Sequence, residues 1–251
     1  MTSYQGGKKR IGKRIYKVIR TIEGQLFGDE KLPYFEPFVG MGGVLRHFAQ
    51  ESDRKVSASD TNPDLMLMWK ALQKGWKPPT SCTRAQYEEY RKSGKHSPER
   101  AFIGIVASYG SVFFNGYRLE YDKKFIHEGY RGLMDIRQDI LRVRFLNAKS
   151  FDKHTHRGKL IYCDPPYKGN TLRSPFFQDF DHDHFWNIMR EWSKNNVVIV
   201  SETAAPKDFK KVWCVESYVS TAKQEKTKKY MDCLFIHESL FNLMDHSLFA
   251  H

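Results

Sequence analysis

Buried-strand patterns alternate with amphipathic helix patterns at both ends of this chain, and that alternation limits its fold more than any other feature. Apolar segments typical of strands cover residues 32–40, 54–60, 159–167, 196–201, 212–219 and 230–236. Helix patterns flank or separate them at residues 9–23, around 44–48, from Asn62 and Pro63 onward, and over 181–192. Because parallel strands need long crossover connections, the pattern predicts an α/β fold built on a parallel sheet.

The alternation is interrupted between residues 75 and 148. KGWKPPTSC (74–82) is typical of a boundary, and helix starts follow at Thr83 and Ser97. The segment 108–125 is dense in aromatic, glycine and basic residues. We therefore predict an α/β domain made of residues 1–74 and 149–240, an inserted helical subdomain over 75–148, and a C-terminal tail over 241–251.

The net charge of +12 favours a polyanionic partner, although charge alone does not separate DNA from RNA or a membrane surface. Basic residues cluster at 8–20, 207–211 and 223–229. The first residues lack the apolar core of a signal peptide, and no uncharged apolar run reaches 18 residues, which predicts a cytosolic or nuclear setting. The four cysteines, Cys82, Cys163, Cys214 and Cys233, lie far apart, so we expect reduced thiols rather than a zinc site or a disulfide scaffold.

A glycine-rich turn, FVGMGG (38–43), follows the first predicted strand. Missing side chains let backbone N–H groups approach a ligand closely, although a tight structural turn explains the glycines equally well. Asp60 ends the next strand, where an acid accepts hydrogen bonds from ribose hydroxyls. Together the two features indicate a cofactor that contains adenosine.

Asp164, Pro165, Pro166 and Tyr167 follow a predicted strand directly, where α/β sheets bind ligands. One reaction that this turn suits is methyl transfer from a sulfonium to an aromatic amine. That reaction needs the lone pair of the amine nitrogen in line with the methyl carbon. The Asp164 carboxylate and the Pro165 carbonyl offer two acceptors for the amine hydrogens, and consecutive prolines fix that carbonyl. Tyr167 offers an aromatic face for an extruded base.

Two other chemistries are disfavoured by the sequence. Methylation of cytosine C5 uses a cysteine nucleophile, usually in a Pro-Cys pair, and no proline here precedes a cysteine. The pairs His154/His156 and His182/His184 have the spacing of metal ligands, but nothing near them in sequence completes a ligand set, so we expect no metal site. Transfer to an exocyclic amino group is the better interpretation.

The order of these motifs resembles the D12 class, or Dam-like α group, of DNA adenine-N6 methyltransferases. YQGGK (4–8) is similar to the family's N-terminal cofactor segment, EPFVGMGGV to its glycine motif, SDTNPDL to its ribose-binding segment and YCDPPY to its catalytic strand end. The resemblance implies a Rossmann-like sheet with a reversed final strand. It also implies S-adenosylmethionine (SAM) as methyl donor and a helical target-recognition region in the insertion.

Carried over residue by residue, the resemblance implies three groups of site residues. The catalytic group is Asp164, Pro165, Pro166 and Tyr167. The cofactor group is Tyr4, Gly6, Gly7, Lys8, Phe38, Gly40, Gly42, Asp60 and Asp164, with Tyr4 standing where relatives commonly have tryptophan. The DNA-binding group is Asn115, Tyr117 and Arg118 in the insertion and Lys223 and Lys226 in the basic segment TAKQEKTKK.

The insertion leaves its role open. An arginine such as Arg118 can read guanine in the major groove, but its spacing from Asn115 differs from that of GATC-reading relatives, and an aromatic minicore under a loop is the competing interpretation. Lys223 and Lys226 are expected to neutralise DNA phosphates.

The resemblance implies double-stranded DNA as the partner and the cytoplasm of a prokaryotic, phage-infected or virus-infected cell as the setting. One flipped base per event requires only a monomer, and whether a cognate restriction endonuclease accompanies the protein stays open. The residues leave three alternatives: methylation of cytosine N4, methylation of adenine N6 in RNA, and a DNA-binding relative without catalysis. Asp at position 164 and the insertion favour DNA through the resemblance.

Overall fold

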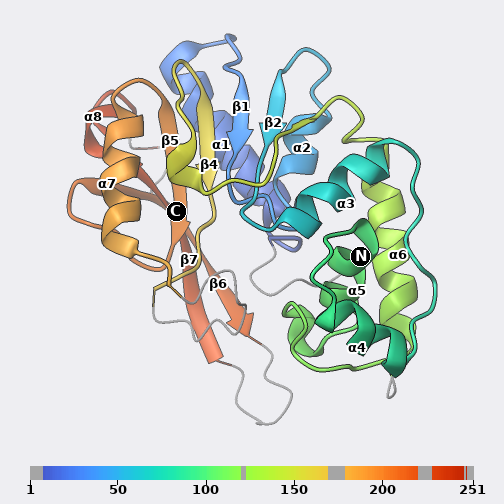
Figure 1. Ribbon diagram of the computed structural model, residues 1–251. Coiled ribbons are helices and arrows are strands. Elements are labelled where there is room, and N and C mark those ends of the chain that lie inside the picture. Colours follow the sequence, from blue (N-terminus) through green and yellow to red (C-terminus); the bar gives the residue numbers. More distant parts are fainter. Residues whose placement is uncertain (1–7, 120–122, 169–178, 220–227, 246, 248–251) are drawn as a thin grey trace.

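The protein folds as a three-layer α/β/α structure around one seven-stranded sheet (Figure 1). The computed structural model describes residues 8–119, 123–168, 179–219, 228–245 and 247. The strands are β1 (Tyr34–Glu36), β2 (Val56–Ala58), β3 (Arg144–Phe145), β4 (Leu160–Cys163), β5 (Val197–Glu202), β6 (Phe209–Val219) and β7 (Lys228–His237). The helices are α1 (Gly12–Phe27), α2 (Leu45–Ala49), α3 (Pro63–Gln73), α4 (Arg84–Lys92), α5 (Pro98–Val106), α6 (Lys124–Arg137), α7 (His182–Ser193) and α8 (Glu238–Phe241).

The strand order is β3-β2-β1-β4-β5-β7-β6. Strands β1 to β5 pair in parallel, whereas β7 runs antiparallel to both β5 and β6. The order reverses between β1 and β4, which is where doubly wound sheets open a crevice for ligands. The predicted α/β fold, with a Rossmann-like sheet and a reversed final strand, is confirmed.

Each face of the sheet has its own apolar layer. Tyr34, Tyr162 and Ile199 point toward α1, α2, α3 and the insertion, whose buried side chains form one cluster. Phe35 and Val200 point the other way, toward a second cluster built mainly on α7. Because successive residues of a strand point to opposite faces, continuous apolar strands are what a sheet covered on both sides requires.

Local sequence signals set several element boundaries. Asn62 accepts hydrogen bonds from the N–H groups of Asp64 and Leu65, and Pro63 occupies the first turn of α3 as predicted. Thr83 caps α4 through a reciprocal capping box. The first strand is shorter than predicted, because Pro33 and Pro37 flank it and proline has no N–H to donate to a sheet.

The insertion packs as a group of helices, α4, α5 and α6, on the side of the molecule away from α7 and α8 (Figure 1). Asp64 at the start of α3 anchors it, because this buried carboxylate accepts the N–H of Ser97 at 2.9 Å and pairs with Arg100. The sheet resumes at β3, which pairs with β2, so residues 144–145 belong to the sheet although the predicted insertion extends to 148.

The expectation of four reduced cysteines is wrong for one pair. Cys214 in β6 and Cys233 in β7 form a disulfide, and they are direct partners in the antiparallel register. Their separation of 19 residues gave no sign of this contact, because only the hairpin pairing brings them together. Cys82 and Cys163 are buried free thiols. Within the described part of the chain, no helix has the length and apolarity needed to span a bilayer.

Candidate active site

The predicted site residues that the structure describes gather mainly at the carboxyl ends of β1, β2 and β4. Gly40 adopts a positive φ of 46° in the turn after β1, and its N–H donates to Asp60 Oδ2 at 3.0 Å. The other carboxylate oxygen of Asp60 accepts the N–H of Asn62, also at 3.0 Å. Trp69 of α3 donates its indole N–H to the Gly40 carbonyl. The glycine turn and the acid after β2 are therefore locked together.

Burial makes the negative charge on the Asp60 carboxylate unfavourable. Burial raises its pKa to about 6, and the N–H groups of Asn62 and Gly40 oppose that rise only in part. A buried carboxylate of this kind gains when additional hydroxyl donors reach it, which is the environment that the hydroxyls of a ribose provide.

The chain from Lys8 to Gly12 lies directly against the glycine turn. A Cβ on Gly43 would come within 3.0 Å of the Lys8 carbonyl carbon, and a Cβ on Gly12 within 2.1 Å of the Gly43 carbonyl oxygen. The Lys8 carbonyl accepts the N–H groups of Ile11 and Gly12, which fixes Lys8 at the start of α1. Close packing of two backbones, made possible by glycine, thus brings Lys8 to the site.

Lys8 lies between two carboxylates. Its Nζ is 3.0 Å from Asp164 Oδ1 and 2.9 Å from Asp232 Oδ2, and it donates to the Tyr167 hydroxyl. Lys8 is 5% exposed and Asp232 only 1%, whereas the Asp164 side chain keeps 17% exposure. Although burial lowers it, the two carboxylates raise the pKa of Lys8 to about 12, so Lys8 is a cation at neutral pH.

Tyr167 is anchored through its hydroxyl. That group donates to Asp232 Oδ1 at 2.7 Å and lies 2.8 Å from the Ser201 hydroxyl, which also donates to Asp232. The backbone N–H of Lys168 donates to Glu202 of β5 at 2.7 Å and secures the end of the turn. The Asp-Pro-Pro-Tyr turn is therefore held at its C-terminal end by β5 and β7, while Lys8 contacts Asp164 at its other end.

The charge on Asp164 depends on its neighbours. Burial raises its pKa to about 6; Lys8 lowers that pKa, and Asp232 raises it. Glu36, at the end of β1, is 2% exposed, and burial raises its pKa well above its usual range. We therefore treat Glu36 as a neutral acid, which accepts a hydrogen bond from the Tyr34 hydroxyl. At pH 7 to 8, Lys8 and Asp164 are therefore charged, and Asp232 is the second ion-pair partner of Lys8.

Phe38 lies apart from this group. It follows β1 but packs on the opposite side of the sheet, with its ring centroid 5.3 Å from Phe151 and about 6 Å from Phe180 and Phe185. Its assignment to the cofactor group stays a prediction.

The predicted recognition residues of the insertion differ in exposure. Arg118 is 8% exposed, donates to the Val106 carbonyl at 2.9 Å and stacks on Phe125 at 3.8 Å. Tyr117 donates its hydroxyl to the Cys82 carbonyl at 2.6 Å. Asn115 is partly exposed at the tip of the loop, near Tyr109, which is 41% exposed. In the described structure Arg118 supports this loop from inside, as the aromatic-minicore interpretation expects.

Five predicted site residues fall outside the described residues: Tyr4, Gly6, Gly7, Lys223 and Lys226. Their roles stay predictions.

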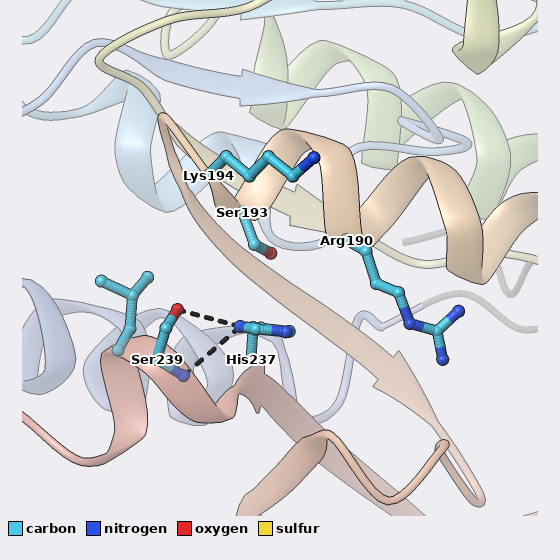
Figure 2. A pocket seen from close by; sticks show the side chains of 6 residues that line it. Arg190, Ser193, Lys194, His237 and Ser239 are labelled. Carbon is cyan, nitrogen blue, oxygen red and sulfur yellow. Dashed lines mark hydrogen bonds between the residues drawn. The ribbon is translucent and has the colours of Figure 1, made fainter.

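A pocket between α7 and α8 is separate from this cluster. Figure 2 shows it lined by side chains that include Arg190, Lys194 and His237. Arg190 is paired with Asp208 at 2.6 Å and Lys194 with Glu191 at 2.7 Å, so both cations are already neutralised. No residue of the Asp-Pro-Pro-Tyr turn lines it, and we do not assign the chemistry to it.

Sequence reasoning missed Asp232 and Ser201. Both point to the same sheet face as Leu234 and Ile199, at positions where the strand pattern calls for apolar residues, and both are essentially buried. A polar residue at a core-facing position of a predicted strand is the signal that identifies such positions.

The strand order and the acid-bearing turn at the end of β4 define a Rossmann-like methyltransferase. Residues 4–103 and 99–231 match the model of the D12 class N6 adenine-specific DNA methyltransferases, and the chain belongs to this family. No curated protein matches the chain in sequence.

Similar solved structures include two of the rRNA methyltransferase aviRa from Streptomyces viridochromogenes. The first is 12% identical with a TM-score of 0.41, and the match covers 92% of this chain and 86% of that one. The second is 13% identical with a TM-score of 0.42, and the match covers 91% and 86%.

Proposed function

We propose that this protein uses SAM to methylate the N6 amino group of an adenine extruded from double-stranded DNA. The observation that carries the proposal is the Asp164 carboxylate, partly exposed at the end of β4 and 3.0 Å from the Lys8 ammonium. Membership of the D12 family supports adenine N6 and DNA as the target. When bound, SAM supplies an electrophilic methyl group.

The residues present suit this cofactor. Asp60 offers a buried carboxylate for ribose hydroxyls, and the glycine turn lets backbone approach the ligand closely. Asp164 follows β4, the strand that pairs with β1, and offers a carboxylate to the cationic sulfonium end of SAM. We assign Lys8, Gly40, Gly42 and Asp60 to the cofactor on this basis.

Asp164 aligns the target amine. Its carboxylate accepts one N6 hydrogen, and the Pro165 carbonyl accepts the other, so that the nitrogen lone pair points at the methyl carbon. As the N–C bond forms, the electrons of the S–C bond remain on sulfur, and the proton that the amine loses passes to the Asp164 carboxylate and from there to solvent. The ion pair with Lys8 uses Asp164 Oδ1, which leaves Oδ2 as the acceptor we assign to the amine.

The extruded base needs an aromatic surface to stack on, and the DNA needs side chains that bind it. Tyr167, held by its hydroxyl, offers its ring to the extruded base. Asn115 at the loop tip and Tyr117 are proposed to contact the DNA, together with Lys223 and Lys226 on the phosphates. We further propose that the protein acts as a cytoplasmic monomer.

Incubation with tritiated SAM and either unmethylated DNA or RNA, followed by nucleoside analysis, tests the proposal. We expect labelled N6-methyladenine from DNA. Label in N4-methylcytosine would correct the base, and label in RNA alone would correct the polymer. Asp164→Ala should abolish transfer and retain most DNA affinity, because it removes an acceptor for the amine and no phosphate contact. Folded protein that binds SAM and methylates nothing would refute the proposal.

A further inference from the structure

We propose that Asp232, together with Ser201, is a positioning residue that shares the Lys8 ammonium with Asp164 and fixes the Tyr167 ring, which keeps Asp164 available to the target amine. This inference rests on the proposed function, because the aligned amine is its purpose. Asp232 belongs to β7, 68 residues after the catalytic acid in sequence, and none of the motifs discussed above includes it.

Geometry gives Asp232 two separate tasks. Its Oδ1 accepts from the Tyr167 and Ser201 hydroxyls at 2.7 and 2.8 Å, and its Oδ2 faces Lys8 Nζ at 2.9 Å. One oxygen therefore holds the hydroxyl end of the Tyr167 ring, which we assign to the extruded base, in place. The other competes with Asp164 for a single cation.

That competition matters because a buried cation attracts whichever carboxylate is nearest. Without Asp232, Lys8 and Asp164 would form a neutral pair, in which the carboxylate is a weaker acceptor for an uncharged amine. With Asp232 present, one positive and two negative charges are buried together, and the cluster keeps a net negative charge beside the amine.

The other groups near Asp164 do not carry this charge. Glu36 faces it from β1, Cys163 and Tyr162 from β4, Tyr167 from its own turn and Tyr230 from β7. Burial raises the pKa of each of these groups, so all five are neutral at pH 7. Lys8 and Asp232 are thus the charges that control Asp164.

The decisive variant is Asp232→Asn, which keeps an oxygen acceptor for Tyr167 and Ser201 and replaces the charged oxygen that faces Lys8 with an uncharged NH2 group. Carbon-13 NMR of labelled aspartate carboxyls follows the titration of Asp164 without any cofactor or DNA, with Asp164→Asn assigning the signal. Since Asp232 raises the pKa of Asp164, we expect the Asp164 midpoint to fall by about one pH unit in Asp232→Asn, which is at the low end of the shifts that a charge within a few ångströms produces. We expect methyl transfer at pH 8 to slow about tenfold, a loss of about 1.4 kcal/mol in transition-state stabilisation.

Ser201→Ala is the matched control, because it removes a hydrogen bond to the same carboxylate and no charge; its Asp164 midpoint should stay at the wild-type value. Should Asp232→Asn not fold, Lys8→Gln and the double variant Lys8→Gln/Asp232→Asn repeat the comparison. Asp164 should titrate at a lower pH in the double variant than in Lys8→Gln alone.

An Asp164 midpoint that does not respond to the loss of Asp232 overturns the proposal, whether or not DNA is methylated. A lowered midpoint with unchanged transfer also overturns it, because Asp232 would then have no part in the reaction. A lowered midpoint in a protein whose wild type methylates no nucleic acid refutes the proposed function instead and supports the charge sharing. A lowered midpoint with slowed transfer supports both.

Discussion

The contact between the start of α1 and the glycine turn provides a sharp test of how the site is assembled. A Cβ on Gly12 would lie 2.1 Å from the Gly43 carbonyl oxygen and 2.9 Å from its carbonyl carbon. Both obstacles are backbone atoms, so no side chain can rotate away. The Gly12→Ala change therefore requires the helix and the turn to separate.

The size of the effect follows from two opposing contributions. Overpacking of a close contact costs about 1 to 3 kcal/mol, and a backbone obstacle places this position at the upper end. Replacing glycine by alanine in a helix returns roughly 0.5 to 1 kcal/mol. We expect a net destabilisation of about 2 kcal/mol, which lowers the melting temperature of a protein this size by roughly 4 to 8 °C.

Gly24→Ala is the matched control in the same helix. Nothing lies within 4 Å of a Cβ at Gly24, so only the helix preference acts, and this variant should be stabilised by about 0.5 to 1 kcal/mol. Urea unfolding gives both free energies, and methyl transfer at saturating DNA reports the site. Because the Gly12 N–H donates to the Lys8 carbonyl, Gly12→Ala should also slow transfer, whereas Gly24→Ala should not.

Equal unfolding midpoints for the two variants would refute the reasoning, since the same chemical change would then be insensitive to its surroundings. A destabilised Gly12→Ala that transfers methyl groups at the wild-type rate would refute the link between this contact and Lys8.

Three further predictions concern charge, the disulfide and the insertion. The pKa of Asp60 is raised from its ordinary 3.8 to about 6, so the stability contributed by its protonated form is complete below about pH 4 and is lost as the pH rises through 6. The free energy of unfolding of the wild type minus that of Asp60→Asn should therefore decline by about 2 kcal/mol between pH 4 and pH 7 in urea titrations; a flat difference would contradict this. Reduction of Cys214–Cys233 should cost about 3 kcal/mol for a loop of this size, and dithiothreitol should not affect the double serine variant. Arg118→Ala should destabilise the protein by about 2 kcal/mol, because it leaves the Val106 carbonyl without its buried donor; unchanged thermal unfolding together with an altered target sequence would instead support direct DNA contact.

The sequence by itself determined the architecture and the position of the reactive turn. Continuous apolar strands alternating with amphipathic helices allow little other than a sheet covered on both faces, and strand ends of such a sheet meet at one edge. Asp60 and Asp164 both follow parallel strands, so the sequence alone predicted that they lie at the same edge of the sheet. The helix caps at Asn62 and Thr83 were predicted correctly because a cap depends only on residues within one helical turn of it.

Only the tertiary structure decided which distant residues complete the site. Asp232 reaches Lys8 because β7 inserts beside β5 in reverse, an arrangement that depends on pairing between strands rather than on any local signal. The same hairpin joins Cys214 to Cys233. Arg118 lies inside its loop because Phe125 and the end of α5 close over it. Short-range preferences specify elements, whereas contacts between residues far apart in the chain are fixed by packing, and the charge on Asp164 is set by those contacts.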